Sequence, residues 1–382
     1  MPRYAKLIAD GMLNRGYDVT ILTAKPYFYR LPLPLTFKKW MGYVDQYLIF
    51  PIQFRLRKKN NNELYVFVDH ALGPWVPLVS NLPHIIHCHD FLAQISAEGE
   101  LRENKTGVTG KYYQRFIRKG YIKGNYFISI SKNTQKDLHR FLKRTPLISE
   151  VIYNGLNQDF NLGNTNLLRS ELSEKFGADL TKGFILHVGG NQFYKNRLGV
   201  LELFDAFTTR REKSIPIILI GAAPNESLVN KKEKMAHREL VYFIQDAPDE
   251  VVKKAYQAAT VLLYPSLAEG FGWPIAEAQA SGCPVITTNA APMSEVSGDA
   301  ALLIPKKTKF NFNDFIEEGV GALETAINWS KEERQKNIEK GIINSQRFDK
   351  NFALDEIERV YKKVFILDQS IHKSLYSNQG TF

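Results

Sequence analysis

Two glutamates with seven residues between them flank a glycine-containing run, Gly-Phe-Gly-Trp-Pro, at positions 270–274. Pro274 suits the first position of a helix, and backbone N–H groups beside the positive end of a helix bind anions such as a diphosphate. Carboxylates accept hydrogen bonds from hydroxyl groups, so Glu277, expected in the first helical turn, suits a ribose diol, and Glu269 suits a sugar. The spacing alone fits equally well two surface charges, one of them complementing the helix dipole.

Two histidines at the end of an apolar run form a second candidate site. His87 and His89 are two positions apart, so on a strand they point to the same face, at the carboxyl end where parallel sheets bind ligands. Two histidines at this spacing can provide the first two ligands of a metal site, but a metal ion needs three or four ligands from the protein. A core role for His87 and a role in binding substrate for His89 are the other interpretations.

Aromatic and basic residues alternate in the segment between Pro26 and Asn62. The aromatic residues are Tyr27, Phe28, Tyr29, Phe37, Trp40, Tyr43, Tyr47, Phe50 and Phe54, and the basic ones are Arg30, Lys38, Lys39, Arg55, Arg57, Lys58 and Lys59. A second patch of this kind spans 111–119. Aromatic rings with cations suit the interface of an anionic membrane. The alternative is an aromatic core with a solvated basic rim, and no recognised motif supports binding of nucleic acid.

These residues need a scaffold, and the chain supplies alternating apolar runs and helical patterns, which favour parallel sheets with crossover helices. The expected strands are 18–22, 63–67, 84–88, 126–130 and 150–152, followed by 184–188, 215–220, 241–244, 260–264, 284–287 and 301–304. An Asn- and Gly-rich linker at 154–166 separates the two series. We therefore expect an α/β protein with two Rossmann-like doubly wound domains, 1–157 and 158–350. Residues 351–382 should form a C-terminal helix and tail that pack back on the first domain.

The first domain opens in an unusual way. Residues 2–15 have a helical pattern, and Gly16 stands where a C-terminal cap would end the helix. A doubly wound domain normally opens with a strand and a Gly-rich turn that approaches a phosphate. Both are missing here, so either the true start lies upstream or the first sheet lacks its first strand.

Composition limits the protein class. The 382 residues, 44% of them hydrophobic, are ordinary for a globular protein, and the two cysteines, Cys88 and Cys283, cannot build a disulfide framework. The net charge of +10 divides into +12 for residues 1–157 and −2 for the rest. No stretch predicts a membrane span or a secretion signal. We expect a cytoplasmic protein, with peripheral attachment at the inner membrane face as an option that the basic first domain allows.

Glu269, Glu277 and the run between them resemble the E-x7-E signature of glycosyltransferase family 4, the group 1 retaining enzymes of GT-B fold. Other segments resemble successive blocks of that family: 188–196, 201–207, 292–296 and 298–303 in the second half, and 87–90, 129–131 and 151–155 in the first. The resemblance covers nearly the whole chain. It implies the GT-B fold and an enzyme that moves a sugar from a nucleotide-sugar donor with retention of configuration.

The resemblance also implies roles for individual residues. Glu277 would hold the donor ribose, Glu269 the transferred sugar, and Lys195 the diphosphate, which gains charge as the glycosidic bond breaks. His89 would donate a hydrogen bond to the donor sugar or the acceptor, with Asp90 orienting it. The remaining donor-binding assignments are Gly189, Gly190, Arg197, Gly270, Phe271 and Gly272.

One position departs from the family pattern. Where the family usually has an arginine five residues before the lysine, this chain has Gly190, and Arg197 is the candidate to replace it. A solvated loop charge is the alternative reading of Lys195.

The expected enzyme is a retaining, metal-independent hexosyltransferase of polysaccharide biosynthesis that needs no cofactor. No Asp-x-Asp sequence occurs, which weakens a metal-dependent alternative. Its partners would be a nucleotide-sugar and a glycan or lipid-linked acceptor, with an anionic membrane surface as a further candidate and no nucleic acid. The alternatives are a catalytically impaired or partner-dependent GT-B protein and a nucleotide-sugar epimerase.

Overall fold

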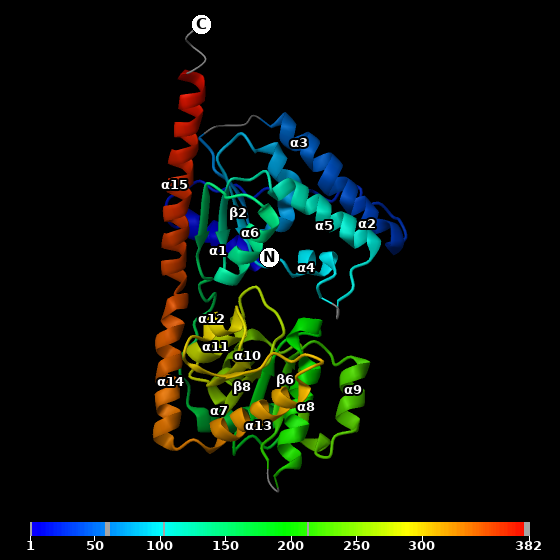
Figure 1. Ribbon diagram of the computed structural model, residues 1–382, viewed down its shortest axis with the longest axis vertical. Coiled ribbons are helices and arrows are strands. Elements are labelled where there is room, and N and C mark those ends of the chain that lie inside the picture. Colours follow the sequence, from blue (N-terminus) through cyan, green and yellow to red (C-terminus); the bar gives the residue numbers. More distant parts are fainter. Residues whose placement is uncertain (1, 58–61, 102–103, 212–213, 378–382) are drawn as a thin grey trace. The chain divides into compact units, whose positions relative to one another are not determined.

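The computed structural model describes residues 2–57, 62–101, 104–211 and 214–377, with side chains to residue 370 (Figure 1). Lys58 and Lys59, two of the basic residues singled out above, and the last residues of the expected tail lie outside the described residues. The chain forms two compact units. Unit 1 comprises Met1–Tyr153 and Asn351–Phe382, and unit 2 comprises Asn154–Lys350.

Unit 1 contains a parallel sheet of four strands in the order β1-β2-β3-β4. The strands are β1 (Tyr65–Phe67), β2 (His84–Cys88), β3 (Tyr126–Ser129) and β4 (Ile148–Val151). They pair in register, with Ile86 opposite Phe67 on one side and Phe127 on the other. β2 and β3 are buried along their whole length, as is typical of the inner strands of a parallel sheet.

The expected strand at 18–22 is wrong. Within the described residues this segment joins no sheet, and Ile21 and Leu22 are 64% and 37% exposed. A strand is stable only when a neighbouring strand completes its backbone hydrogen bonds. The apolar residues Val19, Ile21 and Leu22 favour an extended backbone, but they do not provide that neighbouring strand. The helix expected over 2–15 is present as α1 (Pro2–Leu13), and Gly16 follows it with φ +85°.

Helices surround the sheet of unit 1 (Figure 1). They are α2 (Leu35–Val44), the π-helix η1 (Asp45–Ile49), α3 (Phe50–Leu56), the 3₁₀ segment η2 (His70–Leu78), α4 (Leu92–Glu98), α5 (Val108–Tyr121), α6 (Lys132–Leu142) and α15 (Lys350–Ser377). One face of the sheet packs on α1 and α15, where Ile8 and Met12 meet Ile85, Tyr126 and a row of α15 side chains, among them Leu354, Ile357, Val360 and Val364.

Unit 2 contains a parallel sheet of six strands in the order β10-β9-β8-β5-β6-β7. The strands are β5 (Ile185–Val188), β6 (Ile217–Gly221), β7 (Val241–Gln245), β8 (Val261–Tyr264), β9 (Val285–Thr288) and β10 (Ala301–Ile304). From β5 the chain proceeds to one side through β6 and β7, and then to the other through β8, β9 and β10. The strand order therefore reverses between β5 and β8, the position where doubly wound sheets bind ligands.

The helices of unit 2 cover both faces of this sheet (Figure 1). They are α7 (Thr165–Phe176), η3 (Phe193–Lys195), α8 (Arg197–Thr209), α9 (Glu226–Glu233), η4 (Arg238–Leu240), α10 (Asp249–Ala258), α11 (Trp273–Ala280), α12 (Met293–Ser297), α13 (Phe312–Asn328), α14 (Lys331–Ser345) and η5 (Gln346–Phe348). α8 and α13 share a core with the strands, centred on Phe204, Phe207 and Phe315. The prediction of an α/β protein with two Rossmann-like domains is confirmed.

Candidate functional site

The candidate site of unit 2 is built from two loops that leave the neighbouring strands β5 and β8. Two hydrogen bonds tie the loops together: Leu267 N–H donates to the Tyr194 carbonyl at 2.7 Å, and Asn196 Nδ2 donates to the Pro265 carbonyl at 2.9 Å. The Ser266 hydroxyl lies 2.7 Å from both the Tyr194 carbonyl and Glu269 Oε1, and its one proton is shared between these two acceptors. Asn196 has φ +53°, a left-handed conformation that an asparagine tolerates. The loops thus hold each other in place, and with them the residues between Tyr194 and Glu269.

Lys195 and Glu269 form an ion pair at the centre of these loops. Lys195 Nζ lies 2.9 Å from Glu269 Oε1 and 3.1 Å from Oε2, and it donates to the Tyr264 hydroxyl at 2.6 Å. Both side chains are largely covered, with 16% and 8% of their surface exposed. Lys195 is therefore held by specific partners, and the alternative of a solvated loop charge does not describe it.

The two oxygens of the Glu269 carboxylate differ in their surroundings. Oε1 accepts hydrogen bonds from the Tyr264 hydroxyl at 2.5 Å and the Ser266 hydroxyl at 2.7 Å, in addition to Lys195. Oε2 accepts from Lys195 and from no other residue in the described part of the chain. Oε1 thus anchors the carboxylate, and Oε2 has acceptor capacity left for a ligand hydroxyl. Sequence reasoning missed Tyr264 and Ser266, although both follow directly from the strand end that it singled out.

The glycine run leads into α11, which begins one residue earlier than expected, at Trp273. Gly272 is its N-cap with φ +105°, a conformation that favours glycine. Phe271 is buried, with its ring against Trp273 and Phe348. It anchors the turn, and Gly270, half-buried, joins it to Glu269.

Because α11 begins at Trp273, Glu277 lies in the second turn, which corrects its expected place in the first. Glu277 is half-buried and accepts a hydrogen bond from the Tyr256 hydroxyl at 2.9 Å. Burial, followed by the neighbouring Glu277 charge, raises the pKa of Tyr256 well above its usual value, so Tyr256 remains a donor. The carboxylate therefore has a fixed orientation in the absence of a ligand.

Arg197 lies beside the glycines of the β5 loop. Its Nη1 donates to Asn191 Oδ1 at 2.5 Å and to the Ala222 carbonyl at 2.8 Å, while Nε and Nη2 are covered and have no partner among the described residues. Arg197 is 4% exposed, and burial lowers its pKa. Arg197 thus brings positive charge to this loop, with a backbone carbonyl and a neutral side chain as its partners.

Gly189 and Gly190 pass close to β6. A Cβ atom on Gly221 would lie 2.1 Å from the Gly189 carbonyl oxygen, so the two segments approach as only glycine permits. Beneath Gly189 lies His187, whose Nδ1 donates to the Leu263 carbonyl at 3.0 Å, so its Nε2 carries no proton. Burial lowers the pKa of His187 to about 3, and the charges of Arg197 and Lys195 contribute. Lys195 and Arg197 thus both contribute positive charge around His187.

His89 lies in unit 1, and the residues discussed above lie in unit 2. Its Nε2 donates to the Val68 carbonyl at 2.8 Å, which fixes the ring, and the Tyr4 ring packs edge-on at 4.5 Å. Burial lowers the pKa of His89, so the ring is neutral and its Nδ1 is an acceptor. A neutral His89 would therefore accept a hydrogen bond from a sugar hydroxyl at Nδ1 rather than donate one, which differs from the expected role as a donor. Asp90 does not orient it, since Asp90 Oδ1 accepts from the Leu92 amide at the start of α4.

Two residues near His89 were not predicted. Asp69 and His70 follow β1 directly, and His70 Nδ1 lies 3.2 Å from Asp69 Oδ1. Burial alone would raise the pKa of Asp69, but the hydrogen bond and charge of His70 hold it below its usual value. The signal that could have found them is their place at the carboxyl end of a predicted parallel strand. Among the described residues, no three His, Cys, Asp or Glu side chains converge as metal ligands would.

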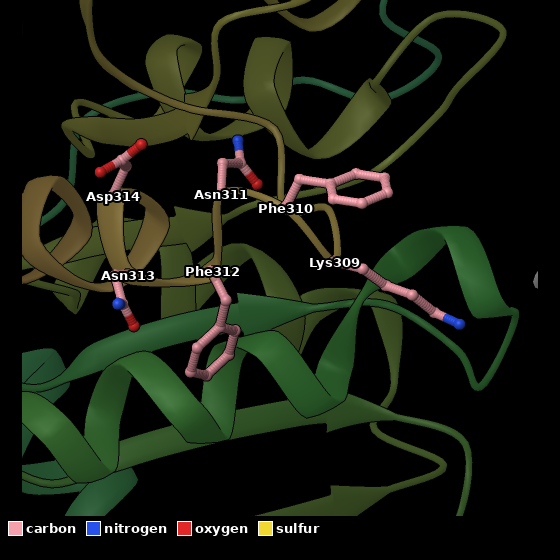
Figure 2. Close-up of a pocket in the computed structure, with 6 residues that line it drawn as sticks. All are labelled: Lys309, Phe310, Asn311, Phe312, Asn313 and Asp314. Carbon is pink, nitrogen blue, oxygen red and sulfur yellow. The ribbon is translucent and has the colours of Figure 1, made fainter.

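An open pocket elsewhere in unit 2 contains none of the predicted site residues. It lies at the start of α13 and is lined by residues 309–314, with the Phe310 ring pointing away from the protein (Figure 2). Phe310 is 96% exposed, so the pocket has no covered apolar wall. The topological switch point remains the best candidate site.

Two family models match the chain. Residues 169–342 match the family model for glycosyl transferases group 1, and residues 1–160 match the model for glycosyltransferase family 4. The chain belongs to the group 1 glycosyltransferases. The first model spans the strands and loops that carry Lys195, Glu269 and Glu277.

Curated relatives of the chain include an O-antigen chain mannosyltransferase B from Escherichia coli, 32% identical over 32% of this chain and 32% of its own length. A D-inositol 3-phosphate glycosyltransferase from Corynebacterium aurimucosum is 23% identical over 59% of this chain and 54% of its own length. The matches thus span about a third to a half of these two relatives.

Solved structures confirm the GT-B fold. WaaG, a glycosyltransferase involved in lipopolysaccharide biosynthesis, has a TM-score of 0.69 at 15% identity, over 93% of this chain and 94% of its own. HepE from Anabaena, in complex with UDP and glucose, has a TM-score of 0.64 at 16% identity, over 92% of this chain and 88% of its own.

Proposed function

We propose that this protein transfers a hexosyl group from a nucleoside diphosphate sugar to an acceptor hydroxyl. The observation that carries the proposal is the Lys195–Glu269 pair at the switch point of the unit 2 sheet, where one side chain suits a phosphate and the other a sugar. In the reaction, the bond between the anomeric carbon and the phosphate oxygen breaks. A bond from that carbon to the acceptor oxygen forms, and the acceptor proton leaves with the nucleoside diphosphate.

The electrostatics of unit 2 favour departure of a diphosphate. Its charge grows as the bond breaks, and preorganised positive groups stabilise that charge without reorganising. Lys195 and Arg197 supply two cations near His187, and the amides of the first turn of α11 add the positive end of a helix. We therefore propose that cations of the protein, rather than a metal, neutralise the departing diphosphate.

Glu269 and Glu277 are proposed to bind the donor through hydroxyl groups. Oε2 of Glu269 would accept from the transferred sugar while Oε1 stays anchored to Tyr264 and Ser266. Glu277, oriented by Tyr256, would accept from the ribose. UDP-sugars are the first donors to test, because the similar HepE structure contains UDP and glucose.

Retention of configuration is proposed from membership of the group 1 enzymes. The anomeric proton of the product distinguishes the outcomes, because an axial and an equatorial linkage differ in their NMR coupling constant. An α-linked product from an α-linked donor supports retention, and a β-linked product refutes it.

The acceptor is proposed to be a glycan or a lipid-linked glycan of a bacterial surface polysaccharide, and the action to take place in the cytoplasm. Two relatives whose names refer to such polysaccharides support this proposal. They are the O-antigen mannosyltransferase and the capsular polysaccharide glycosyltransferase CapM of Staphylococcus aureus, the latter 24% identical over half of each chain. His89, together with Asp69 and His70, is the candidate group of unit 1 for binding this acceptor or the transferred sugar.

The deciding experiment measures release of nucleoside diphosphate from a panel of UDP-, GDP- and ADP-sugars, with and without an acceptor fraction. Glu269→Gln and Lys195→Gln should each lower turnover by about 100-fold or more, because each removes a charged group next to the reacting bond. Glu202→Gln is the matched control, since Glu202 is a partly covered glutamate of the same unit paired with Lys307.

The outcomes separate the alternatives. Wild-type turnover in both site variants refutes the assignment. No release with any donor, alone or with a candidate partner, indicates an impaired GT-B protein, and product formation from the donor without any acceptor indicates an epimerase.

A further inference from the structure

The strongest feature outside the donor site is a continuous apolar and basic surface on unit 1. It consists of the exposed sides of α2, η1, α3 and α5 with the loop 27–33, and we call it the α2–α5 face. Its exposed apolar side chains, each between 38% and 85% uncovered, are Tyr27, Phe28, Tyr29, Leu31, Leu33, Leu35, Phe37, Trp40, Leu48, Ile52, Leu56, Val108, Tyr112 and Phe116. Single exposed apolar residues are ordinary, but a group of this size marks an interaction site.

Part of this exposed apolar surface lies along one side of a well-ordered helical segment. Leu48, Ile52 and Leu56 are four residues apart along η1 and α3, so they form one ridge, and they are 55%, 46% and 82% exposed. The opposite side of the same segment is well packed. The ring centres of Phe50 and Trp75 are 4.2 Å apart, and those of Phe54 and Tyr65 are 5.8 Å apart. The segment thus has its own core contacts and a second apolar side that faces solvent.

The face is also rigidly built. Asp45, 3% exposed, accepts the amides of Phe28 and Tyr29 at 2.9 Å each, which holds the aromatic loop against the start of η1. The Tyr47 hydroxyl shares a 2.7 Å hydrogen bond with that of Tyr113, which joins η1 to α5. A preformed surface loses little conformational entropy when it binds.

Aromatic contacts join the α2–η1–α3 segment to α5. The Tyr43 ring stacks on Tyr113 at 5.6 Å, and Phe116 packs against Tyr47 at 5.3 Å while remaining 43% exposed. The labelled helices α2, α3 and α5 accordingly lie side by side in Figure 1. The apolar surface therefore passes from the α2–α3 segment to α5 without a polar break at Phe116.

Charge identifies the occupant. Residues 26–57 contain five basic residues and one acidic residue, and that one, Asp45, is buried. α5 has four basic residues and no acidic one. Arg118 pairs with Glu98, whereas Lys111, Arg115 and Lys119 pair with no carboxylate in the described part of the chain. Arg57 likewise pairs with a glutamate, Glu63, and the other cations leave an excess of exposed positive charge. An apolar surface with such an excess complements an anionic bilayer, whose surface attracts cations and whose acyl chains accept apolar side chains.

On this face, two basic side chains lie close to aromatic rings, an arrangement that suits the headgroup layer of a membrane. Lys38 Nζ lies 5.5 Å from the Tyr29 ring centre, and the Arg115 guanidinium lies 5.7 Å from that of Tyr112. Each pair presents a ring at headgroup depth with a charge next to it for a lipid phosphate. We propose that the α2–α5 face docks unit 1 on an anionic lipid bilayer by inserting the ridge Leu48, Ile52 and Leu56. Docking would bring a lipid-linked acceptor to the enzyme, a consequence that rests on the proposed function.

The test is co-sedimentation of the full chain with vesicles of phosphatidylcholine containing a third of phosphatidylglycerol, at about 0.15 M salt. The triple variant Leu48→Ser, Ile52→Ser and Leu56→Ser should lower the vesicle partition coefficient by about 100-fold, from the loss of three inserted aliphatic side chains. The matched control is Leu167→Ser, Ile343→Ser and Ile366→Ser, which removes side chains 65%, 66% and 67% exposed and lying on other elements. It should bind vesicles as the wild type does.

A second arm separates insertion from charge. Replacing Lys38, Lys39, Lys111 and Lys119 with Gln should abolish the preference for anionic over zwitterionic vesicles, while the binding to phosphatidylcholine that remains is unchanged. Because the substituted ridge side chains are at least about half exposed, the circular dichroism of the triple variant should match that of the wild type.

Three results overturn the proposal: a wild type that does not bind the vesicles, a triple variant that binds like its control, and a wild-type dimer that the triple variant dissolves, because the face is then a protein interface. Donor turnover, measured on the same samples without vesicles, reports on the proposed function alone. Its loss leaves the docking result standing, and retained turnover without vesicle binding refutes docking alone.

Discussion

Removal of the Tyr361 hydroxyl probes a buried hydrogen-bond chain that joins three separate parts of unit 1. His87 on β2 lies between two tyrosines, with Nδ1 2.7 Å from the Tyr4 hydroxyl of α1 and Nε2 2.7 Å from the Tyr361 hydroxyl of α15. Burial lowers the pKa of His87 to about 3, so near pH 7 the ring is neutral, with one N–H and one lone pair. One tyrosine therefore donates to the ring and the other accepts from it.

The magnitude follows from burial. His87 is completely covered and Tyr361 is 8% exposed, so Tyr361→Phe leaves a ring nitrogen without a partner and without access to water. Such a group costs about 1–3 kcal/mol. The matched control is Tyr17→Phe, which removes another tyrosine hydroxyl bonded to α15, at Glu358, but from a residue 40% exposed, and should cost below about 0.5 kcal/mol.

The assay is urea unfolding at pH 7.5 followed by circular dichroism, with hydrogen exchange of the β2 amides to assign the loss to unit 1. Tyr361→Phe should lower the free energy of unfolding of unit 1 and speed exchange of residues 84–88, and Tyr17→Phe should do neither to a comparable degree. Equal behaviour of the two variants would refute the reasoning, because the buried hydroxyl would then be worth no more than the solvated one.

Three further outcomes are expected. Ser266→Ala should lower kcat about tenfold and lower the melting temperature by a few degrees, because a fully buried hydroxyl that serves both Glu269 Oε1 and the Tyr194 carbonyl is lost; an unchanged kcat would show that the carboxylate needs no such support. Tyr256→Phe should raise the donor KM several-fold with kcat little changed, since Glu277 loses its orienting donor; a fall in kcat alone would contradict a role in binding ribose. His187, fully buried with its pKa lowered to about 3, is neutral in the folded protein and protonated in the unfolded chain below about pH 6.5. Stability should therefore fall by about 2 kcal/mol per such histidine between pH 7 and pH 5, and His187→Gln should reduce that slope in urea unfolding; an unchanged slope would exclude this cause.

Much of the fold was predictable because fully buried parallel strands leave a strong local signal. The run that became β8 is apolar throughout, and both β2 and β8 are buried along their whole length. The segment 18–22 carried a similar local signal, but strand formation depends on a neighbour that the local pattern does not encode. The 3₁₀ segment η2 was missed for a related reason, since Pro74 and Pro77 indicate irregular backbone without stating which kind.

The candidate site divides in the same way. Glu269 was chosen by residue type and spacing and Lys195 by the family resemblance, and the structure brings them together. The hydroxyl groups of Tyr264 and Ser266 that hold Glu269 were not foreseen, because tyrosine and serine near a strand end are common and only tertiary contacts single them out. The role of His89 changes for a similar reason: the carbonyl of Val68 decides which ring nitrogen carries the proton, and a backbone acceptor leaves no mark in the sequence.

The two-segment construction of unit 1 has a consequence for synthesis on the ribosome. Ile85, Tyr126 and Ile128 lie on the face of the unit 1 sheet that packs against α15. The residues of α15 leave the ribosome only after the whole of residues 154–350 has been synthesised. At translation rates of about 5–20 residues per second, that delay is roughly 10–40 s. Unit 2, continuous in sequence, can complete its fold during this time, while unit 1 waits with an uncovered apolar sheet face. The first half of the chain is therefore the last to be finished, and the interval before α15 emerges is when the nascent protein most needs protection from aggregation.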